Sequence, residues 1–453
     1  MSERADVVVI GMGPGGESVA GRLAEAGLDV VGVDSGLVGG ECPYWGCIPS
    51  KMMIRAANLV AETRRVPGMA GTSTVQPSWE PVARRIRDEA TDDWDDRVAV
   101  ERFEGKGGRF LRGAGRVVGP GRVEVGDVVV EAGRAIVLAT GTDASIPPVD
   151  GLRDVPYWTN HEAIEVAELP ASIVVLGGGA VGVELGQVFN RFGVEVTVVE
   201  ALDRLLAGEE PEAGALIAEM LEREGVSVRT SAKVTRVRED GATIAVELEG
   251  GSRAAGERLL VATGRTADVR ALGVDSIGVD PAARWLPVDD HLRVAPGVWA
   301  VGDITGKGAF THVAMYQAGI VVDDVLGRDV APADYKALPR VTFTDPEVGA
   351  VGLSEAQARE RGLDVRVGVA KVPSTARGWI HKAGNEGFIK LVEDARRGVL
   401  VGATSAGPAG GDVLGLLALA VHAEVPTAHL RRMIFAYPTF HRGVEDALRH
   451  MAH

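Results

Sequence analysis

The residues best suited to chemistry are Cys42 and Cys47, the only two cysteines of the chain. They lie five residues apart in a stretch rich in glycine and proline, and a helix is predicted to follow from Lys51 to about Arg65. The partial positive charge of a helix N-terminus favours a thiolate, and Lys51 acts in the same direction. Two buried cysteines that serve only as small apolar side chains are the alternative, which fits scattered cysteines better. The spacing therefore predicts a redox-active or catalytic pair.

Length and charge limit the classes to which the protein can belong. The chain has 453 residues, enough for about three domains, and its net charge of −15 argues against nucleic acid or an anionic membrane as a main partner. No apolar run is long enough to span a bilayer, and the N-terminus lacks the charged and apolar regions of a signal peptide. We expect a cytoplasmic protein that binds neither membrane nor nucleic acid and has no metal site.

The N-terminal residues follow the order strand, glycine-rich turn, helix, strand and acid. A buried strand is predicted for 5–10, and Gly11, Gly13 and Gly16 then form the pattern G-x-G-x-x-G before a helix. The first glycine allows the tight turn, the second lets the backbone approach a pyrophosphate, and the third lets helix and strand pack closely. Asp34 ends the next strand, where a carboxylate can accept from ribose hydroxyls. These residues predict a dinucleotide site.

The same unit occurs a second time. Gly177, Gly179 and Gly182 follow a predicted strand at 173–176, and Glu200 ends the strand after the next helix. The acid follows the first glycine by 23 residues in both units, so the chain is predicted to bind two dinucleotides. A carboxylate at Glu200 would repel a 2′-phosphate, which favours NADH over NADPH.

Each unit also has a later strand that ends in a turn next to the expected nucleotide. The segments 136–141 and 259–265 both contain the sequence Ala-Thr-Gly. Ordinary strand and loop structure, without a ligand, is the alternative interpretation of these segments. The further cofactor-binding residues that we expect are Gly40, Gly115, Thr140, Gly141 and Gly264.

The rest of the chain gives weaker signals. The region 55–107 is predicted to be mostly helical apart from a loop at 66–77, and 109–130 has the pattern of a small β-meander. Residues 147–151 have the composition of a linker. From residue 338 the pattern predicts strands at 341–343 and 364–372, a hairpin from 387–392 and 399–403, and helices at 412–423 and 427–434.

Together these motifs resemble the pyridine nucleotide-disulphide oxidoreductases, a family of flavoproteins related to dihydrolipoamide dehydrogenase, glutathione reductase and mercuric reductase. The resemblance implies an α/β fold with two Rossmann-like dinucleotide-binding domains and a C-terminal α+β dimerisation domain, in a homodimer. It places the FAD-binding domain at 1–149 and 267–336, the NAD(P)-binding domain at 150–266 and the dimerisation domain at 337–453. The segments that carry it are 39–51, both glycine patterns, 262–265, 301–303, 343–347 and 351–353.

The resemblance also implies roles for the matched residues. The first glycine pattern and the acid after it would hold the adenosine diphosphate part of FAD, and Asp303 would bind the ribityl chain. Cys47 would lie against the flavin and Cys42 would exchange with substrate. Lys51 would lie near flavin N5, paired with Glu184, although a surface ion pair is the alternative for these two residues. A hydride from the nicotinamide would reduce the flavin, and the flavin would reduce the disulfide.

The C-terminal segment departs from the family pattern. Disulfide reductases of this family carry a His-Pro-Thr segment with a glutamate five residues after the histidine. That histidine, from the partner subunit, protonates and deprotonates the exchanging thiols. Here Tyr437 stands in place of the histidine and Arg442 in place of the glutamate. A phenol titrates near ~10, too high for an efficient base in thiol exchange. His441 is close enough in sequence to substitute, with a surface histidine at a helix start as the alternative.

A second departure lies beside the cysteines, where Glu41, Tyr44 and Trp45 replace the residues usual in the better-known reductases. The electron acceptor is therefore open between a small disulfide and a quinone-like or dye-like compound. Mercuric reduction is disfavoured because it uses an extra cysteine pair in this family, and a transhydrogenase usually lacks the redox cysteines. A flavin-bound sensor or interaction protein is the non-enzyme alternative. We expect an FAD-dependent, NADH-linked oxidoreductase that acts on a small-molecule acceptor.

Overall fold

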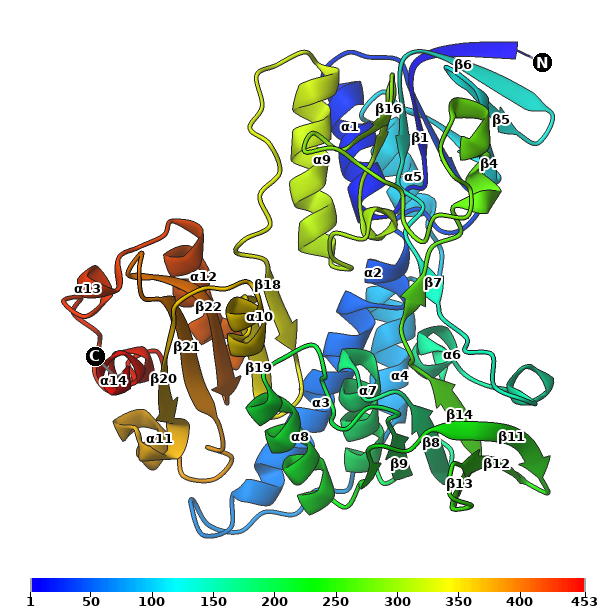
Figure 1. Ribbon diagram of the computed structural model, residues 1–453. Helices are drawn as coiled ribbons and strands as arrows, with labels where there is room; N and C mark the ends of the chain where they lie inside the picture. The colour runs from blue at the N-terminus through cyan, green and yellow to red at the C-terminus, as the bar shows by residue number, and fades with distance from the viewer. Residues whose placement is uncertain (1, 452–453) are drawn as a thin grey trace. The chain divides into compact units, whose positions relative to one another are not determined.

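The structure is a computed structural model, and it describes residues 2–451. The chain forms two compact units, whose elements are labelled in Figure 1. The first unit contains the residues up to 50 together with 83–145 and 264–333. The second contains 51–82, 146–263 and the residues from 334 onward. The division into three domains that the resemblance implies stays a prediction.

The first unit is built on a sheet whose strands follow the order β16-β17-β6-β1-β2-β3. The strands from β17 to β3 are parallel, and β16 runs antiparallel to β17. Val7, Val8 and Val9 of β1 are fully buried, as expected for a parallel sheet covered on both faces. The strands are β1 (Ser2–Ile10), β2 (Val30–Asp34), β3 (Arg109–Arg112), β6 (Val128–Leu138), β16 (Arg293–Ala295) and β17 (Val298–Ala300).

Three helices cover one face of this sheet, and a β-meander covers the other. The helices α1 (Pro14–Glu25) and α9 (Thr311–Val325) lie side by side and share a core with α5 (Arg97–Glu104) (Figure 1). The antiparallel strands β4 (Gly115–Gly119) and β5 (Arg122–Val125) continue from β6 and pack on the opposite face. The predicted meander at 109–130 is therefore wrong for β3, because β3 pairs with β2 and extends the parallel sheet.

The helix after the cysteines begins earlier than the sequence predicts. It runs over Cys47–Arg65 as α3, after the short α2 (Glu41–Tyr44). Pro49 is tolerated in the first turn of α3 because the N–H that proline lacks needs no helical partner there. Between α3 and α5 the chain forms α4 (Glu80–Arg85) and one π-helical turn, η1 (Ile86–Ala90).

The second unit contains a parallel sheet of order β10-β9-β8-β14 and a three-stranded antiparallel sheet, β11-β12-β13. The three-stranded sheet is not expected from the sequence pattern. The elements of this region are α6 (Asn160–Glu165), β8 (Ser172–Leu176), α7 (Ala180–Arg191), β9 (Glu195–Val199), α8 (Pro211–Arg223), β10 (Ser227–Arg229), β11 (Val234–Asp240), β12 (Thr243–Leu248), β13 (Arg253–Gly256) and β14 (Arg258–Val261).

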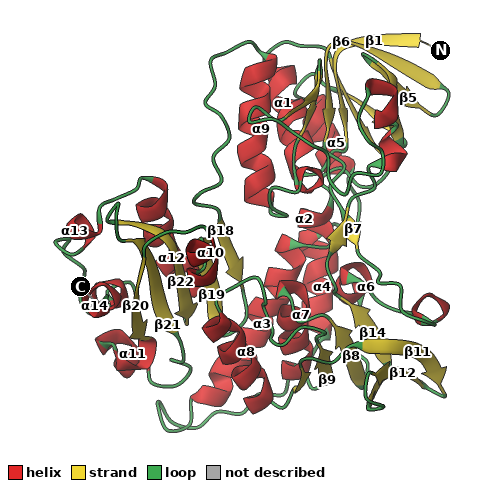
Figure 2. Cartoon of the chain, viewed as in Figure 1, coloured by secondary structure: helices red, strands yellow, loops and turns green. Residues whose placement is uncertain are grey.

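The C-terminal part of the second unit is an antiparallel sheet of order β18-β19-β22-β21-β20, with helices α12 and α14 sharing its core (Figure 2). The predicted hairpin is confirmed as β21 and β22, whereas the helix predicted for 427–434 is shorter, because α13 ends at Leu430. The elements are β18 (Pro339–Thr342), β19 (Glu347–Gly352), α10 (Glu355–Glu360), β20 (Val365–Lys371), α11 (Ala376–His381), β21 (Phe388–Asp394), β22 (Val399–Gly407), α12 (Gly410–His422), α13 (Thr427–Leu430) and α14 (Gly443–His450).

Short elements and ion pairs complete the architecture. The buried Lys390 of β21 forms ion pairs with Glu210 at 2.9 Å and Glu212 at 2.8 Å, which link the C-terminal sheet to α8. The remaining elements are β7 (Asp143–Ala144) paired with β15 (Arg265–Thr266), and the 3₁₀ turns Leu152–Asp154, Arg270–Leu272, Val274–Ile277, Asp303–Thr305 and Val372–Ser374. These elements confirm the predicted α/β class.

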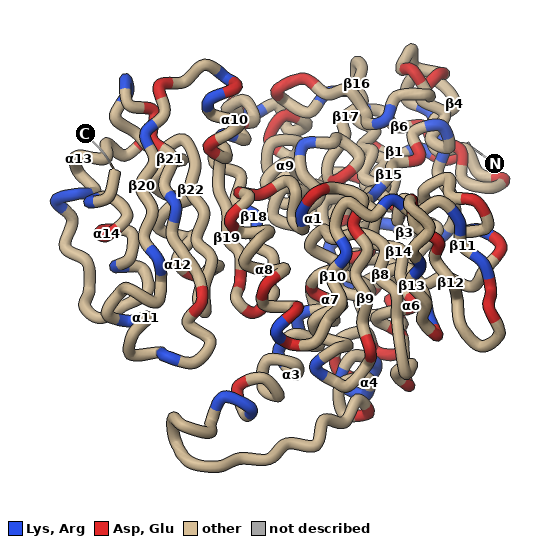
Figure 3. The backbone as a smooth tube through the Cα atoms, turned by 60° about the horizontal axis from the view of Figure 1, so that its bottom comes forward, with Lys and Arg blue, Asp and Glu red and all other residues tan. Residues whose placement is uncertain are grey.

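Charged residues are distributed along the whole chain, with basic and acidic side chains interspersed (Figure 3). Within residues 2–451, no helix combines the length and the apolar character needed to cross a membrane.

Candidate functional site

The two cysteines are placed by two consecutive helices. Cys42 lies in α2, and Cys47 is the first residue of α3. The hydroxyl of Thr311, the first residue of α9, lies 3.4 Å from the sulfur of Cys47. Two helix N-termini therefore face this sulfur, and both favour negative charge on it.

The two sulfur atoms are not equivalent. The pKa of the Cys42 thiol is raised well above its ordinary value, first because it hydrogen-bonds to Cys47 and second because it is partly buried. The Cys42 thiol therefore loses its proton less readily than an ordinary cysteine. Two neighbouring thiols can exchange two electrons by closing and opening a disulfide.

Lys51 follows Cys47 by one turn of α3 and forms an ion pair with Glu184 of α7. The ammonium nitrogen lies 2.8 Å from Glu184 Oε2 and 4.7 Å from the centre of the Phe343 ring. The backbone N–H of Phe343 donates to Glu184 Oε1 at 2.8 Å, so both oxygens of this carboxylate have a partner. Glu184 is only 5% exposed. A buried carboxylate held in this way fixes the position of the lysine charge, and the surface-pair alternative does not describe it.

A network of buried polar groups holds this pair in place. Gln187, one turn after Glu184, exchanges two hydrogen bonds with the backbone of Asp345. Arg191, 1% exposed, reaches the Asp345 carboxylate at 2.8 Å and the Glu224 carboxylate at 2.5 Å. Separating one partner from such a network would leave a buried charge unpaired, which is costly. The positions of Gln187, Arg191 and the helix α7 that carries Glu184 are therefore strongly fixed.

The first glycine pattern has the geometry that a pyrophosphate site needs. Gly11 has φ +94°, and a Cβ there would lie 2.4 Å from the Ala139 carbonyl oxygen. A Cβ on Gly13 would meet no atom closer than 4.0 Å, so the backbone is open at this point. Gly40, φ +64°, packs its backbone against Gly13 and brings the cysteine segment next to this turn.

The second pattern repeats this arrangement. Gly177 has φ +109° and is closed in by Ala262, whereas a Cβ on Gly179 would meet no atom within 4 Å. Glu200 accepts from the backbone N–H of Gly178 at 2.6 Å, as Asp34 accepts from that of Met12 at 2.6 Å in the first unit. Both turns are open where a pyrophosphate would lie, so the residues present fit two dinucleotides. The third glycines, Gly16 and Gly182, pack against the carbonyl oxygens of Gly11 and Gly177.

Asp303 follows β17 and is connected to the turn after β6. Thr142 donates to its Oδ2 at 3.0 Å, and Arg265 donates to the Thr142 hydroxyl at 2.7 Å. Burial raises the pKa of the Asp303 carboxyl, with the nearby Arg265 acting in the opposite direction. Glu41, one of the departures from the family pattern, lies 3.5 Å from Arg265. A partly buried carboxylate at this position is available to accept from ligand hydroxyl groups.

The remaining expected cofactor residues fall into two kinds. Gly141 and Gly264 have positive φ and no atom within 4 Å of a Cβ, so their backbones are open, and Thr140 beside them is exposed. Gly115 instead packs against Ile10 and Val33, at the ends of β1 and β2. All of these positions stay predictions as cofactor contacts.

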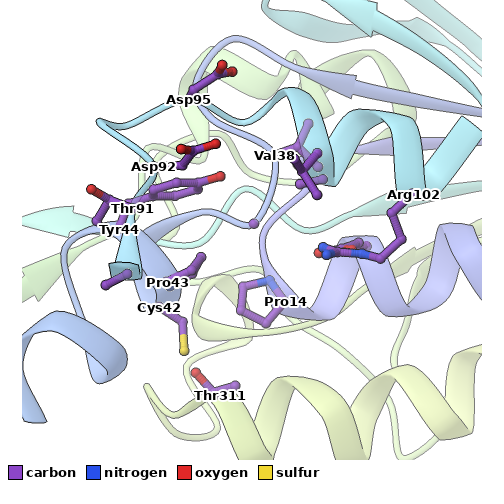
Figure 4. A pocket seen from close by; sticks show the side chains of 15 residues that line it. Pro14, Val38, Cys42, Pro43, Tyr44, Thr91, Asp92, Asp95, Arg102 and Thr311 are labelled. Atoms are coloured by element: carbon purple, nitrogen blue, oxygen red, sulfur yellow. The ribbon is translucent and has the colours of Figure 1, made fainter. Parts of the chain in front are cut away.

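The dithiol adjoins a cavity of about 430 Å³ in the first unit. Figure 4 shows the sulfur of Cys42 facing Thr311 at one end, with Tyr44, Asp92 and Asp95 on one side and Arg102 on the other. Thr311 and the cavity residues between 90 and 102 are functional candidates that only the structure reveals, because no sequence motif marks them. The one available signal is that Thr311 follows Asp303 by eight residues.

The C-terminal segment presents its two candidate residues differently. Tyr437 is 70% exposed, with the Arg442 guanidinium 5.3 Å from its ring centre. His441 is half-buried, and its Nε2 lies 3.4 Å from the Thr439 hydroxyl. Within residues 2–451, His, Cys, Asp and Glu side chains form no group of three or more that could hold a metal ion.

The chain matches two family models. Residues 5–318 match the pyridine nucleotide-disulphide oxidoreductase model, and residues 338–448 match the dimerisation domain of the same family. Dihydrolipoyl dehydrogenase of Thermus scotoductus is 33% identical over 98% of this chain and 96% of its own length. Mercuric reductase of Bacillus cereus is 31% identical over 98% of this chain and 71% of its own length.

A solved structure agrees with these matches. The Cu(II) complex of the HOCl-induced flavoprotein disulfide reductase RclA from Escherichia coli superposes with a TM-score of 0.87 at 26% identity, over 99% of both chains. The resemblance predicted from the motifs is confirmed, together with the fold class. The chain belongs to the pyridine nucleotide-disulphide oxidoreductases, enzymes that depend on FAD and use a pyridine nucleotide.

Proposed function

We propose that the enzyme oxidises NADH and reduces a small quinone-like or dye-like acceptor in preference to a disulfide substrate. The electrons would reach the acceptor either through the Cys42–Cys47 pair or directly from the reduced flavin. The observation that carries the proposal is the tyrosine at the position of the expected histidine, together with a Cys42 thiol whose pKa is raised by its hydrogen bond to Cys47 and by burial. An exchanging thiol must lose its proton to attack a disulfide and must protonate the leaving thiol. Transfer of two electrons to a quinone requires no such exchange.

The residues described above would hold the FAD. Gly11 and Gly13 would receive the pyrophosphate, Asp34 the adenosine ribose and Asp303 the ribityl hydroxyls. Bound FAD would take a hydride from the nicotinamide and make two electrons available to the dithiol or to an acceptor. For a quinone the balance is NADH, one proton and quinone giving NAD⁺ and quinol.

Lys51 would supply positive charge on the side of α3 that Cys47 occupies. The two residues are four apart in one helix and therefore lie on the same face. The buried carboxylate of Glu184 keeps the ammonium group in one position and balances its charge when no ligand is bound. A fixed positive charge next to a redox centre favours its reduced, more negative form.

The preference for NADH rests on Glu200. Its two oxygens accept from the backbone N–H groups of Gly178 and Leu202, which holds the carboxylate at the end of β9. Each oxygen has a second lone pair, which can accept from a ribose hydroxyl. Arg204, the nearby residue best able to bind a 2′-phosphate, donates instead to the carbonyl oxygen of Ala207 and pairs with Asp203.

We also propose that the enzyme is a homodimer. Large apolar and aromatic side chains of α11, of α12 and of the loop between α13 and α14 are left exposed, which favours a second subunit as their cover. The most exposed are Trp379 at 70%, Leu419 at 60%, Ile434 at 96% and Tyr437 at 70%. Light scattering at micromolar concentration tests this proposal, and a monomer would contradict it. Because NADH is its proposed electron donor, we assign the enzyme to the cytoplasm.

An anaerobic titration with NADH, followed by a panel of acceptors, tests the proposed function. We expect two electrons per subunit to reduce the disulfide, and we expect naphthoquinone to be turned over faster than lipoamide or glutathione disulfide. Cu(II) belongs in the panel because the similar Escherichia coli protein was solved as a Cu(II) complex. Unchanged thiol counts after NADH, or fast disulfide turnover with slow quinone turnover, would contradict the proposal.

A further inference from the structure

The cavity beside Cys42 carries an unbalanced negative charge. Its charged lining consists of Glu17, Asp92, Asp95 and Arg102. Arg102 donates to Glu17 at 2.9 and 2.5 Å, so these two charges offset each other and the aspartates remain. Asp95 also lies 3.9 Å from Arg97, a guanidinium that is mostly exposed and does not line the cavity.

The other lining residues are mainly apolar. Pro14, Val38, Pro43, Val98 and Ala99 surround the opening together with the Tyr44 ring (Figure 4). The pKa of Tyr44 is raised, first by burial and then by the acids around it, which agrees with a negative potential in this region. The cavity therefore combines apolar walls that suit a ring compound with a charge that opposes an anion.

The backbone that carries the two aspartates is held in an unusual conformation. Asp92, Asp93 and Trp94 have φ of 48°, 55° and 57°, three consecutive left-handed residues of which none is glycine. The π-helical turn η1 directly precedes this segment. Such conformations are disfavoured for residues with a side chain and persist at sites where the surrounding structure imposes them. Here they direct Asp92 and Asp95 to the side of the cavity near Tyr44 (Figure 4).

We propose that Asp92 and Asp95 make the cavity beside Cys42 select neutral or cationic electron acceptors over anionic ones. The inference rests on the proposed function, in which Cys42 faces the acceptor. It narrows the acceptor class, because uncharged quinones and cationic dyes enter the negative potential without penalty. Sulfonated quinones and disulfides with a net negative charge are repelled by it.

Labelling of Cys42 by charged reagents tests the inference without any turnover. The variant Cys47→Ser leaves Cys42 as the only cysteine of the chain. Its thiolate displaces methanesulfinate from a methanethiosulfonate and forms a mixed disulfide, so the rate reports how easily each reagent reaches the sulfur. The two probes are the cationic trimethylammonioethyl and the anionic sulfonatoethyl methanethiosulfonates, and the measured quantity is the ratio of their rates.

Adding Asp92→Asn and Asp95→Asn to Cys47→Ser should lower this ratio roughly tenfold at low salt. Asp93→Asn is the control: it removes one carboxylate, where the test variant removes two, from the same left-handed turn but outside the cavity lining, and asparagine tolerates this conformation. We expect a change of less than about twofold for the control. An unchanged ratio in the aspartate variant, or an equal change in the control, would overturn the inference.

Ionic strength gives a second measurement that needs no aspartate variant. In Cys47→Ser alone, the ratio should fall several-fold between low salt and about 1 M salt, where the Debye length is ~3 Å. A ratio independent of salt would also overturn the inference. The outcome is separate from that of the proposed function: failure of NADH to reduce the disulfide would reject the function, whereas the labelling ratio is measured without NADH.

Discussion

The surroundings of α3, which carries Cys47 and Lys51, and the segment 433–442 differ in how far their functional side chains are buried. Around α3, Glu184 is buried, both of its oxygens are hydrogen-bonded, and Arg191 fixes the helix that carries it. In the C-terminal segment Ile434 is 96% exposed and Tyr437 is 70% exposed. The first region is complete within one chain. The second leaves its apolar side chains uncovered, as expected for a surface that a second subunit completes.

This difference indicates where the enzyme can vary its chemistry. A change in the first region disturbs a buried charged network and is costly, because an unpaired buried charge destabilises the fold by about 3–5 kcal/mol. A change in the exposed segment costs little stability. Tyr437, at the position of the expected histidine, belongs to the exposed segment. We therefore expect it to affect the acceptor step and to leave the dithiol intact.

The largest effect is expected from Cys47→Ser. A thiolate at Cys47 should give the NADH-reduced enzyme a long-wavelength absorption band, because it would lie against the flavin. The variant should lose this band completely, together with any turnover that needs the dithiol. Cys42→Ser is the matched variant and should keep the band, since Cys47 is the sulfur expected to lie against the flavin. A band that survives in Cys47→Ser and disappears in Cys42→Ser would reverse the assignment of the two sulfurs.

Tyr437→His tests the second region. General acid–base help is worth roughly 10²–10⁴ in rate, and we expect disulfide turnover to rise toward the lower end of this range because Arg442 still replaces the expected glutamate. Quinone turnover should change less than about twofold, since it needs no thiol exchange. His441→Ala is measured beside it. The unmodified enzyme could turn over disulfides fast, and His441→Ala could leave that rate unchanged. This outcome would show that neither Tyr437 nor His441 limits the thiol exchange.

The pH dependence of disulfide turnover separates a bare thiol from one with a histidine base. Because the pKa of Cys42 is raised, its reactive thiolate is the minor form near neutral pH. Below that pKa the thiolate fraction increases about tenfold for each pH unit, so turnover should increase steadily between pH 6 and 9. A plateau beginning near pH 7 would instead indicate an imidazole base. Quinone turnover measured over the same range is the control.

The sequence predicted the parts of the site that depend on backbone geometry. Gly11 and Gly177 were expected to make tight turns, and both have positive φ with no room for a Cβ. Such turns restrict which residue fits, so a single sequence carries the signal. The C-terminal hairpin was predictable because two mostly apolar segments, 387–392 and 399–403, are separated by a turn.

Features that depend on distant contacts were not predictable. Thr311 is 264 residues from Cys47 and lies next to it because α9 packs along α1. The left-handed segment from Asp92 to Trp94 contains no glycine, so its sequence gives no sign of its conformation. The raised pKa of Cys42 depends on the position of one sulfur relative to another, which the spacing of the cysteines does not determine.

The smallest effect concerns Glu200, whose carboxylate is held at the end of β9 by two backbone N–H groups. A hydrogen bond from a ribose hydroxyl to a carboxylate is worth about 1.5–3 kcal/mol, so Glu200→Gln should lower kcat/KM for NADH by about tenfold, because the amide oxygen still accepts. The same change removes the repulsion of a 2′-phosphate and should raise kcat/KM for NADPH. Arg204→Gln is the control, and it should leave the preference within about twofold if Arg204 remains bound to Ala207 and Asp203. If the unmodified enzyme uses NADPH as well as NADH, and Arg204→Gln abolishes that use, then Arg204 rather than Glu200 determines the choice of nucleotide.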